Sequence, residues 1–234
     1  MTRRGRFLSF EGLDGCGKTT QLNLLTGFLE QRGIEVVTAR EPGGTAVGER
    51  IRALLLDSRT QGLSPIAELG LMFSSRAQLI AEFIEPSLAA GKWVICDRYS
   101  DSSVAYQGGG RGLGIDKVLA VHQALCGSLW PELTVLMDAG IAPSVERARR
   151  RNEESTQIEG HSDENRFEQE NREFFERVHE AYMAIARREP ERVLVIDARH
   201  SIREVHAAIR TAVTRRFPEL LQPAGGSEAA VHGI

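Results

Sequence analysis

The segment with the clearest chemistry is GLDGCGKT, residues 12–19, which matches the phosphate-binding pattern GxxxxGK[ST] in full. Its glycines allow the backbone to turn so that successive N–H groups face one point, where phosphate oxygens bind. Lys18 adds a positive charge for the outer phosphates, and the Thr19 hydroxyl suits the coordination shell of Mg²⁺. The segment therefore predicts a site for a nucleoside triphosphate and magnesium. Cys16, between two glycines, is interpreted as a small space-filling residue rather than a nucleophile.

Isolated arginines suggest a second phosphate site. Asp97 and Arg98 directly follow an apolar run. Arg76 lies in a helical segment, where Met72 and Phe73 occupy the i−4 and i−3 positions on the same face. A guanidinium can grip a phosphate while neighbouring apolar side chains cover a base. A protein that joins two phosphates must neutralise the charge of both, so we expect the two arginines to serve an acceptor phosphate. The alternative is that Arg76 lies on a solvated helix face.

Apolar runs that alternate with helical stretches are expected to position these residues. The predicted strands are 7–10, 34–39, 93–96, 133–137 and 193–196. The predicted helices are 18–32, 49–56, 66–90, 116–126, one with Pro143 at its first position, 166–188, and a last one opened by a capping box of Ser201 and Glu204. Strands that are apolar throughout indicate a parallel sheet covered on both faces. Ligands bind beyond the carboxyl ends of such strands, so the chemistry should gather just after residues 10, 39, 97 and 138.

Four stretches are expected to lie outside regular structure. Residues 40–48 contain Pro-Gly-Gly and are predicted to form a loop, and residues 108–114 (GGGRGLG) are predicted to form a flexible one. Residues 152–165 are charged and short of apolar anchors, which indicates a mobile excursion. The tail 222–234 is predicted to be disordered.

Length and composition indicate one intracellular domain. The chain has 234 residues, 26% charged and 41% hydrophobic. At roughly 100–200 residues per domain, residues 1–221 are expected to form a single domain. Twenty-nine basic against 32 acidic residues give a net charge of −3, so no positive field argues for a nucleic-acid or membrane partner. Three cysteines without a CxxC pair argue against disulfides and zinc, and the absence of a signal peptide or long apolar run predicts a cytoplasmic location.

The phosphate-binding loop alone does not name a reaction, because GTPases, ATPase motors and kinases share it. The base-reading signature NKxD of GTPases is absent, since Lys117 follows Asp116 with no asparagine before it. No ABC-type signature is present either. A nucleotide or nucleoside kinase is the favoured interpretation, and a nucleotide-dependent switch that binds a protein stays open as the alternative.

Five segments together resemble the bacterial thymidylate kinases. They are FEGLDGCGKTTQ (10–21), REPGGT (40–45), RAQ (76–78), DRYSDSSVAYQGGG (97–110) and RARRR (147–151), in that family's order. The combination is far more specific than the loop alone. The resemblance implies an α/β fold of the P-loop NTPase type, with three layers around a five-stranded parallel sheet and a mobile lid near residues 147–166. It also implies the reaction ATP + dTMP → ADP + dTDP, magnesium as cofactor and a homodimer.

The resemblance also implies a set of site residues. ATP is implied to bind Gly12, Leu13, Asp14, Gly15, Cys16, Gly17, Lys18, Thr19, Thr20 and Arg147. The implied dTMP site comprises Asp14, Glu41, Pro42, Met72, Phe73, Arg76, Arg98, Ser102, Ser103, Tyr106 and Gln107. The implied catalytic residues are Lys18, Asp14, Arg98 and Arg151, and the implied magnesium site is Thr19 with Asp97. Tyr106 beside the sugar would disfavour a 2′-hydroxyl, which makes the expected acceptor a deoxynucleotide.

Two of these assignments carry alternatives. The family often places an aromatic residue four positions before the equivalent of Arg76, where this sequence has Met72 with Phe73 beside it, so either can cover the base. Asp97 can hold a magnesium-bound water or orient Arg98.

The resemblance is to the type of thymidylate kinase whose lid supplies the catalytic arginine, and residues 14–16 of the phosphate-binding loop agree with that type because they carry no positive charge. Arg151 is expected to reach the γ-phosphate in the manner of an arginine finger, and Arg147 to contact ATP, for instance by stacking on adenine. The alternative is that the run 147–151 is a basic helix end that faces solvent.

Overall fold

The centre of the molecule is a five-stranded sheet with strand order β2-β3-β1-β4-β5 in which all neighbours are parallel. The computed structural model describes residues 4–156 and 165–221, and of residues 151–156 it describes the backbone. The strands are β1 (Phe7–Glu11), β2 (Val36–Arg40), β3 (Trp93–Asp97), β4 (Leu133–Asp138) and β5 (Val193–Asp197). The predicted α/β fold with five parallel strands is confirmed.

Each strand ends one residue later than predicted, on a charged side chain at the carboxyl edge of the sheet. At the centre of this edge, Phe10 pairs with Asp97 and with Val135, and Glu11 pairs with Leu136. The polar ends of β1 and β3 therefore lie side by side at the edge where ligands bind in parallel sheets. β2 begins at Val36, two residues after its predicted start.

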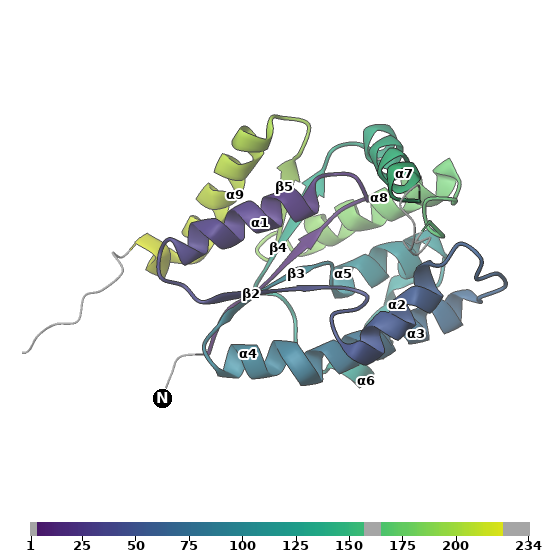
Figure 1. The fold of residues 1–234 in the computed structure, drawn as a ribbon, viewed down its shortest axis with the longest axis horizontal. Helices are drawn as coiled ribbons and strands as arrows, with labels where there is room; N and C mark the ends of the chain where they lie inside the picture. Colours follow the sequence, from purple (N-terminus) through teal and green to yellow (C-terminus); the bar gives the residue numbers. More distant parts are fainter. Residues whose placement is uncertain (1–3, 157–164, 222–234) are drawn as a thin grey trace, which may run out of the picture.

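Helices cover both faces of the sheet (Figure 1). The helices α1 (Lys18–Glu30) and α9 (Ile202–Arg216) pack on one face, where Leu8 and Phe10 of β1 point. The opposite face is covered by α3 (Pro65–Leu79), α6 (Ile115–Cys126) and α8 (Arg172–Arg188), and α2 (Ala46–Leu56) packs on α3. Phe7 points to this second face. The alternation follows from the two-residue period of a strand.

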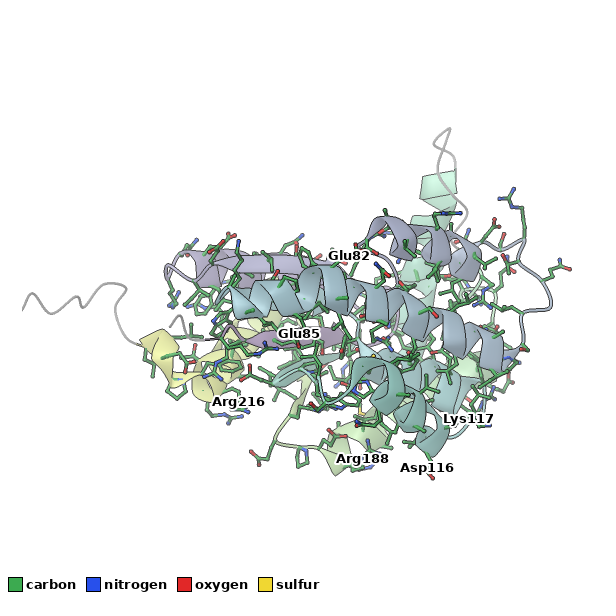
Figure 2. All side chains as sticks on the ribbon, turned by 90° about the horizontal axis from the view of Figure 1, so that it is seen from below. Glu82, Glu85, Asp116, Lys117, Arg188 and Arg216 are labelled. Atoms are coloured by element: carbon green, nitrogen blue, oxygen red, sulfur yellow. The ribbon has the colours of Figure 1, made fainter. Side chains whose placement is uncertain are left out.

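The predicted helix 66–90 forms a single run with a change of winding in its middle. It consists of α3, a π-helical turn η1 (Ile80–Ile84) and α4 (Glu85–Ala89), and it crosses the underside of the molecule with Glu82 and Glu85 on it (Figure 2). Pro86 has no N–H and its ring would clash with a carbonyl four residues back, so a wider turn just before it keeps the run continuous.

The glycine-rich segment 108–114 is not the flexible loop predicted from its composition. Residues up to Gly110 belong to a second π-helical turn, η2 (Val104–Gly110), which continues the short helix α5 (Ser100–Ser103). A Cβ on Gly110 would lie 2.6 Å from the ring of Phe174, and one on Gly109 would lie 2.7 Å from the Cβ of Ala181. These glycines allow η2 to approach α8 closely, so here glycine marks packing rather than flexibility.

Five helix starts differ from their predicted positions, and two of them, those of α3 and α6 (Ile115–Cys126), differ by a single residue. α2 begins at Ala46 rather than 49, because the Thr45 hydroxyl accepts a hydrogen bond from Gly48 N and caps the helix. α8 begins at Arg172 rather than 166, capped in the same way by Asn171. α7 (Ile141–Thr156) begins two residues before Pro143, so this proline is the third helical residue, where its missing N–H still costs no helical bond. α3 begins one residue early, on Pro65.

The carboxyl-terminal part of the described chain consists of α9 and a short turn after it. The capping box that opens α9 is confirmed, and a 3₁₀ turn η3 (Pro218–Leu221) follows that helix. α7 continues to Thr156, so residues 152–156 are helical and were wrongly placed in an excursion. The rest of that prediction, residues 157–164, and the tail 222–234 lie outside the described residues. Among the residues with a described structure, no helix has the length and hydrophobicity needed to cross a bilayer.

Candidate active site

The phosphate-binding loop joins β1 to α1 and is closed by its own lysine. Lys18 Nζ donates hydrogen bonds to the carbonyls of Gly12 (3.2 Å) and Leu13 (2.9 Å) and lies 3.7 Å from Asp14 Oδ1. Gly15 has a φ of +79°, and a Cβ there would lie 2.2 Å from the carbonyl of Ser144 in α7. The loop therefore requires glycine at this position both for its turn and for the close approach of α7.

Two oxygen ligands suitable for a divalent cation meet beside this loop. Thr19 Oγ1 at the start of α1 donates to Asp97 Oδ2 at the end of β3, at 3.0 Å. A hydroxyl and a carboxylate are ligands that Mg²⁺ accepts, so the donor set fits the predicted metal. Both groups lie next to the loop because β1 and β3 are neighbours in the sheet.

Arg98 links the phosphate-binding loop to the second predicted site. Its Nη2 lies 2.8 Å from Asp14 Oδ1, and its Nη1 donates to Ser102 Oγ at 3.0 Å and to Tyr182 Oη at 3.2 Å. Arg98 has a φ of +72°, and it is the sole non-glycine residue in 4–156 and 165–221 with a positive φ. Such backbone strain persists where the surroundings fix the conformation, and here Arg98 N donates to Phe10 O at 2.9 Å.

A buried carboxylate that the sequence did not reveal as a site residue lies under Arg98. Glu11 ends β1 and accepts hydrogen bonds from Tyr99 N (2.7 Å), Ser102 Oγ (2.6 Å) and Tyr182 Oη (2.8 Å). Burial and the nearby charge of Asp101 raise the pKa of Glu11 to about 7, against the lowering effect of Arg98. The available signal was its position, because a charged residue at the end of a buried strand is rarely without a partner.

Arg76 is buried in the wall of the second predicted phosphate site. Its Nε lies 2.6 Å from Glu41 Oε2, and its other nitrogens donate to Ser103 Oγ and to Tyr99 O, both at 3.2 Å. Its guanidinium also lies 4.4 Å from the ring centre of Phe73. Arg76 is 2% exposed, so the alternative of a solvated helix face is wrong. Burial raises the pKa of Glu41 to about 7, although Arg76 opposes that shift.

A cavity opens between these groups. The predicted site residues that line it are Asp14, Glu41, Pro42, Met72, Arg76, Arg98, Ser102, Ser103, Tyr106 and Gln107. Phe73 is the exception, because it is fully buried in the core behind Arg76. Of the two side chains that could cover the base, Met72 and Phe73, it is therefore Met72 that faces the cavity.

Four residues of the cavity wall were not predicted: Arg52, Leu56, Phe167 and Glu168. Arg52 comes from α2, where its Nη1 donates to the carbonyl of Pro42 at 2.9 Å. Phe167 and Glu168 come from residues 166–171, which were predicted to be helical but precede the start of α8. A helix prediction gives no reason to bring these side chains to the cavity, so the signal for them was absent.

Three other predicted residues lie around the loop. Thr20 is exposed in the first turn of α1. Cys16 is 2% exposed, and burial raises the pKa of its thiol, which supports a packing role. Arg147 is exposed on α7, and its Nε donates to Pro143 O at 3.0 Å. Its Cβ would lie 3.1 Å from a Cβ on Gly15, so α7 passes directly over the loop. The side chain of Arg151 lies outside the described residues.

Comparisons with known proteins agree with this geometry. A family model described as thymidylate kinase matches residues 10–209. Among the relatives, a thymidylate kinase of Pelobacter propionicus is 45% identical over 205 residues, covering 88% of this chain and 92% of that protein. One from Alkalilimnicola ehrlichii is 44% identical, covering 91% of this chain and 95% of that protein.

A solved structure is similar over most of its length. The crystal structure of thymidylate kinase from Ehrlichia chaffeensis superposes with a TM-score of 0.70 at 32% identity, covering 90% of this chain and 99% of that one. The family model spans more than half of the present sequence, and the relatives exceed 40% identity over nearly their full lengths. The chain therefore belongs to the thymidylate kinase family.

Proposed function

We propose that this protein transfers the γ-phosphate of ATP to dTMP, giving ADP and dTDP. The observation that carries the proposal is the contact between Arg98 Nη2 and Asp14 Oδ1 at 2.8 Å. It joins the cavity wall to the phosphate-binding loop, so an acceptor in the cavity and a triphosphate on the loop would lie next to each other. Donor and acceptor phosphates need this proximity for direct transfer.

On the donor side, backbone N–H groups of residues 12–17 and the start of α1 would bind the triphosphate. Lys18 would exchange its present carbonyl partners for phosphate oxygens. Thr19 and Asp97 would hold Mg²⁺, directly or through a water molecule. When bound, the ion neutralises charge on the phosphates and orients them.

On the acceptor side, Arg98 and the nearby Arg52 and Arg76 would hold the dTMP phosphate at the end of the cavity that meets the loop. A phosphate oxygen of dTMP attacks the γ-phosphorus in line, the new P–O bond forms, and the bond to the β–γ bridging oxygen breaks, so that ADP leaves. The acceptor phosphate is already ionised near neutral pH, and no general base is required. Tyr106 would lie beside the sugar and disfavour a 2′-hydroxyl.

Residues 147–166 would form the lid, with Arg151 reaching the γ-phosphate and Arg147 contacting ATP. The close approach of α7 to Gly15 supports it, because this helix starts beside the loop and carries both arginines. Closure would exclude water and thereby suppress hydrolysis of ATP.

For organisation, we propose one kinase domain over residues 1–221 that works in the cytoplasm as a homodimer. Exposed apolar side chains on neighbouring helices support the dimer: Leu54 of α2 is 47% exposed, Ile66 of α3 52% and Leu125 of α6 47%. Sedimentation of the wild type and of Leu54→Glu tests this, since the proposal expects a dimer that the substitution weakens.

The test of the activity is a panel of acceptors in an assay coupled to ADP release, with product analysis. The panel is dTMP, dUMP, UMP, dCMP and thymidine. The proposal expects dTMP to be the best acceptor and dTDP to be the product. A strong preference for unphosphorylated thymidine would contradict the phosphate-binding role of Arg98, and slow ATP hydrolysis without a phosphorylated product would favour the nucleotide-dependent switch.

A further inference from the structure

The base end of the cavity is backed by a buried carboxylate, Glu68 of α3, which is 1% exposed. It receives donors from two different segments. Gln107 Nε2 of η2 donates to its Oε1 at 2.9 Å, and Arg111 Nε lies 3.2 Å from each of its oxygens. Arg166 Nη2, from the segment after residue 164, lies 2.8 Å from its Oε2. A buried carboxylate with this many donors acts as a fixed anchor for the side chains that contact it.

Glu68 determines which atom of Gln107 faces the cavity. A carboxylate accepts hydrogen bonds and does not donate them, so the Gln107 amide must turn its NH₂ group toward Glu68. The Gln107 carbonyl oxygen, Oε1, then points the other way. Gln107 lines the cavity, and within the described ranges its Oε1 has no hydrogen-bond donor. The cavity wall therefore presents an acceptor at this position.

The position of Gln107 relative to the reacting end follows from the fold. Arg76, Met72 and Glu68 are spaced by four residues on one face of α3, and Arg76 is the one beside Glu41. Glu68 precedes Arg76 by eight residues, about 12 Å along the helix axis, so Gln107, which contacts Glu68 and lines the cavity, lies at the end away from Arg76. An acceptor whose phosphate lies at Arg98 would place its base at this far end.

The same carboxylate holds the outer wall of the cavity. Arg166 N donates to Leu56 O at 3.1 Å, and the Arg166 side chain is paired with Glu68. Phe167, the next residue, lines the cavity and packs edge-on against Tyr106 at 5.6 Å between ring centres. The base end is thus enclosed by two segments that share one anchor.

We propose that Glu68 is a positioning residue that selects the pyrimidine of the acceptor by fixing the Gln107 amide. A fixed carbonyl oxygen accepts a hydrogen bond from the N3–H of thymine or uracil. Cytosine has an unprotonated N3 at this position, so two acceptors would face each other without a proton. The inference rests on the proposed function, since it assumes that the acceptor is a pyrimidine nucleotide.

The test compares Glu68→Gln with the wild type by measuring kcat/KM for dTMP, dUMP and dCMP at saturating ATP. A glutamine at 68 can donate as well as accept, so the Gln107 amide is free to turn over and present its NH₂ to cytosine. We expect the preference for dTMP over dCMP to fall roughly tenfold, with the KM for ATP unchanged. The preference for dTMP over dUMP should stay within twofold, because both bases carry N3–H.

Two further variants separate positioning from general damage. Glu170→Gln removes another carboxylate that pairs with Arg111 but does not touch Gln107, and it should leave the dTMP-to-dCMP preference unchanged. Gln107→Ala should lower that preference as much as Glu68→Gln does, and the double variant should lower it no further. If Glu68→Gln does not fold, Glu68→Asp keeps the charge but withdraws the carboxylate by about 1.5 Å, and it should reduce the preference.

The outcomes are distinct. An unchanged dTMP-to-dCMP preference in folded Glu68 variants, or an additive loss in the double variant, would overturn the inference while leaving the kinase assignment intact. A wild type that transfers phosphate to none of the three pyrimidine nucleotides would overturn the proposed function itself. Equal losses of kcat/KM on all three acceptors would show that Glu68 only supports the fold, and this result also overturns the inference.

Discussion

The donor and acceptor sides of the active site are built on different principles. The proposed donor side is one continuous loop, residues 12–19, where backbone N–H groups at the start of a helix would bind the triphosphate. The acceptor side is assembled from side chains of at least five segments, and it depends on buried contacts such as those of Arg76 with Glu41 and of Gln107 with Glu68. The backbone site needs few particular side chains, whereas the side-chain site can be damaged at many positions.

Lys18→Ala should have the largest effect on the reaction, because it removes the one positive side-chain charge within residues 12–19. We expect kcat to fall about a thousandfold, as for loss of a main electrostatic contact to a transferring group. Binding of dTMP alone, followed by calorimetry, should stay within twofold of the wild type. Loss of dTMP binding in a folded Lys18→Ala protein would show that the two sides are not separable.

Removing the Arg98 side chain should damage the acceptor side by about a hundredfold in kcat/KM for dTMP, with the Kd of ATP nearly unchanged. Arg98→Gly is the better variant, because glycine adopts a φ of +72° freely and Arg98→Ala leaves a strained backbone. Both should lose the same activity, and Arg98→Ala should have the lower Tm. Arg172→Ala, which removes an exposed arginine of α8, is the control. Equal losses of ATP and dTMP affinity would contradict the assignment.

Gly110→Ala should break the packing that supports the acceptor wall, because its Cβ would lie 2.6 Å from Phe174 and 2.8 Å from Val178. Overpacking of this kind costs about 1–3 kcal/mol in the free energy of unfolding. Gly27→Ala in α1 is the matched control, since nothing lies within 4 Å of its Cβ, and it should stabilise the protein by up to about 1 kcal/mol. Urea unfolding of both variants checks the contrast, and a destabilised Gly27→Ala with an unaffected Gly110→Ala would reverse it.

Glu11 should give the acceptor side a dependence of stability on pH that is smaller than these effects. Its pKa is raised from the ordinary value of 4.5 to about 7, so the folded state binds the proton more tightly than the unfolded state. The stability contributed by this group is therefore complete below about pH 4.5 and is lost as the pH rises to about 7.

The measurement is urea unfolding of the wild type and of Glu11→Gln at several pH values. The unfolding free energy of the wild type minus that of the variant should decrease between about pH 4.5 and 7 and be constant above that range. A difference that increases with pH would mean that Glu11 is stabilised as a carboxylate by Arg98 and its hydroxyl donors.

The features that the sequence predicted correctly are those determined by residues close together along the chain. The five strands, the donor loop and the capping box of Ser201 and Glu204 are recognisable because neighbouring residues determine them. The residues 108–110 were misjudged because their glycines serve a contact with α8, a helix more than 60 residues away along the chain. Composition signals a turn, and it does not report which partner requires the space.

In the candidate site, too, the residues in local sequence motifs were predicted, and those placed by contacts between distant segments were not. Most cavity residues were predicted through their motifs, but Phe167 and Glu168 follow Arg166, which is paired with the distant Glu68. That pairing joins residues 98 positions apart in the sequence. Likewise, the choice of Met72 over Phe73 depends on the rotation of α3, which the burial of Arg76 against Glu41 fixes.

The central claim is that one chain binds two phosphorylated ligands at adjoining sites, and simultaneous binding tests it most directly. dTMP is titrated into protein saturated with a non-hydrolysable ATP analogue and Mg²⁺, and the heat of binding and the retained analogue are both measured. The account predicts one dTMP per chain, with the analogue still bound. Displacement of the analogue by dTMP would contradict it, because the two nucleotides would then share a single site and direct transfer between them would have no basis.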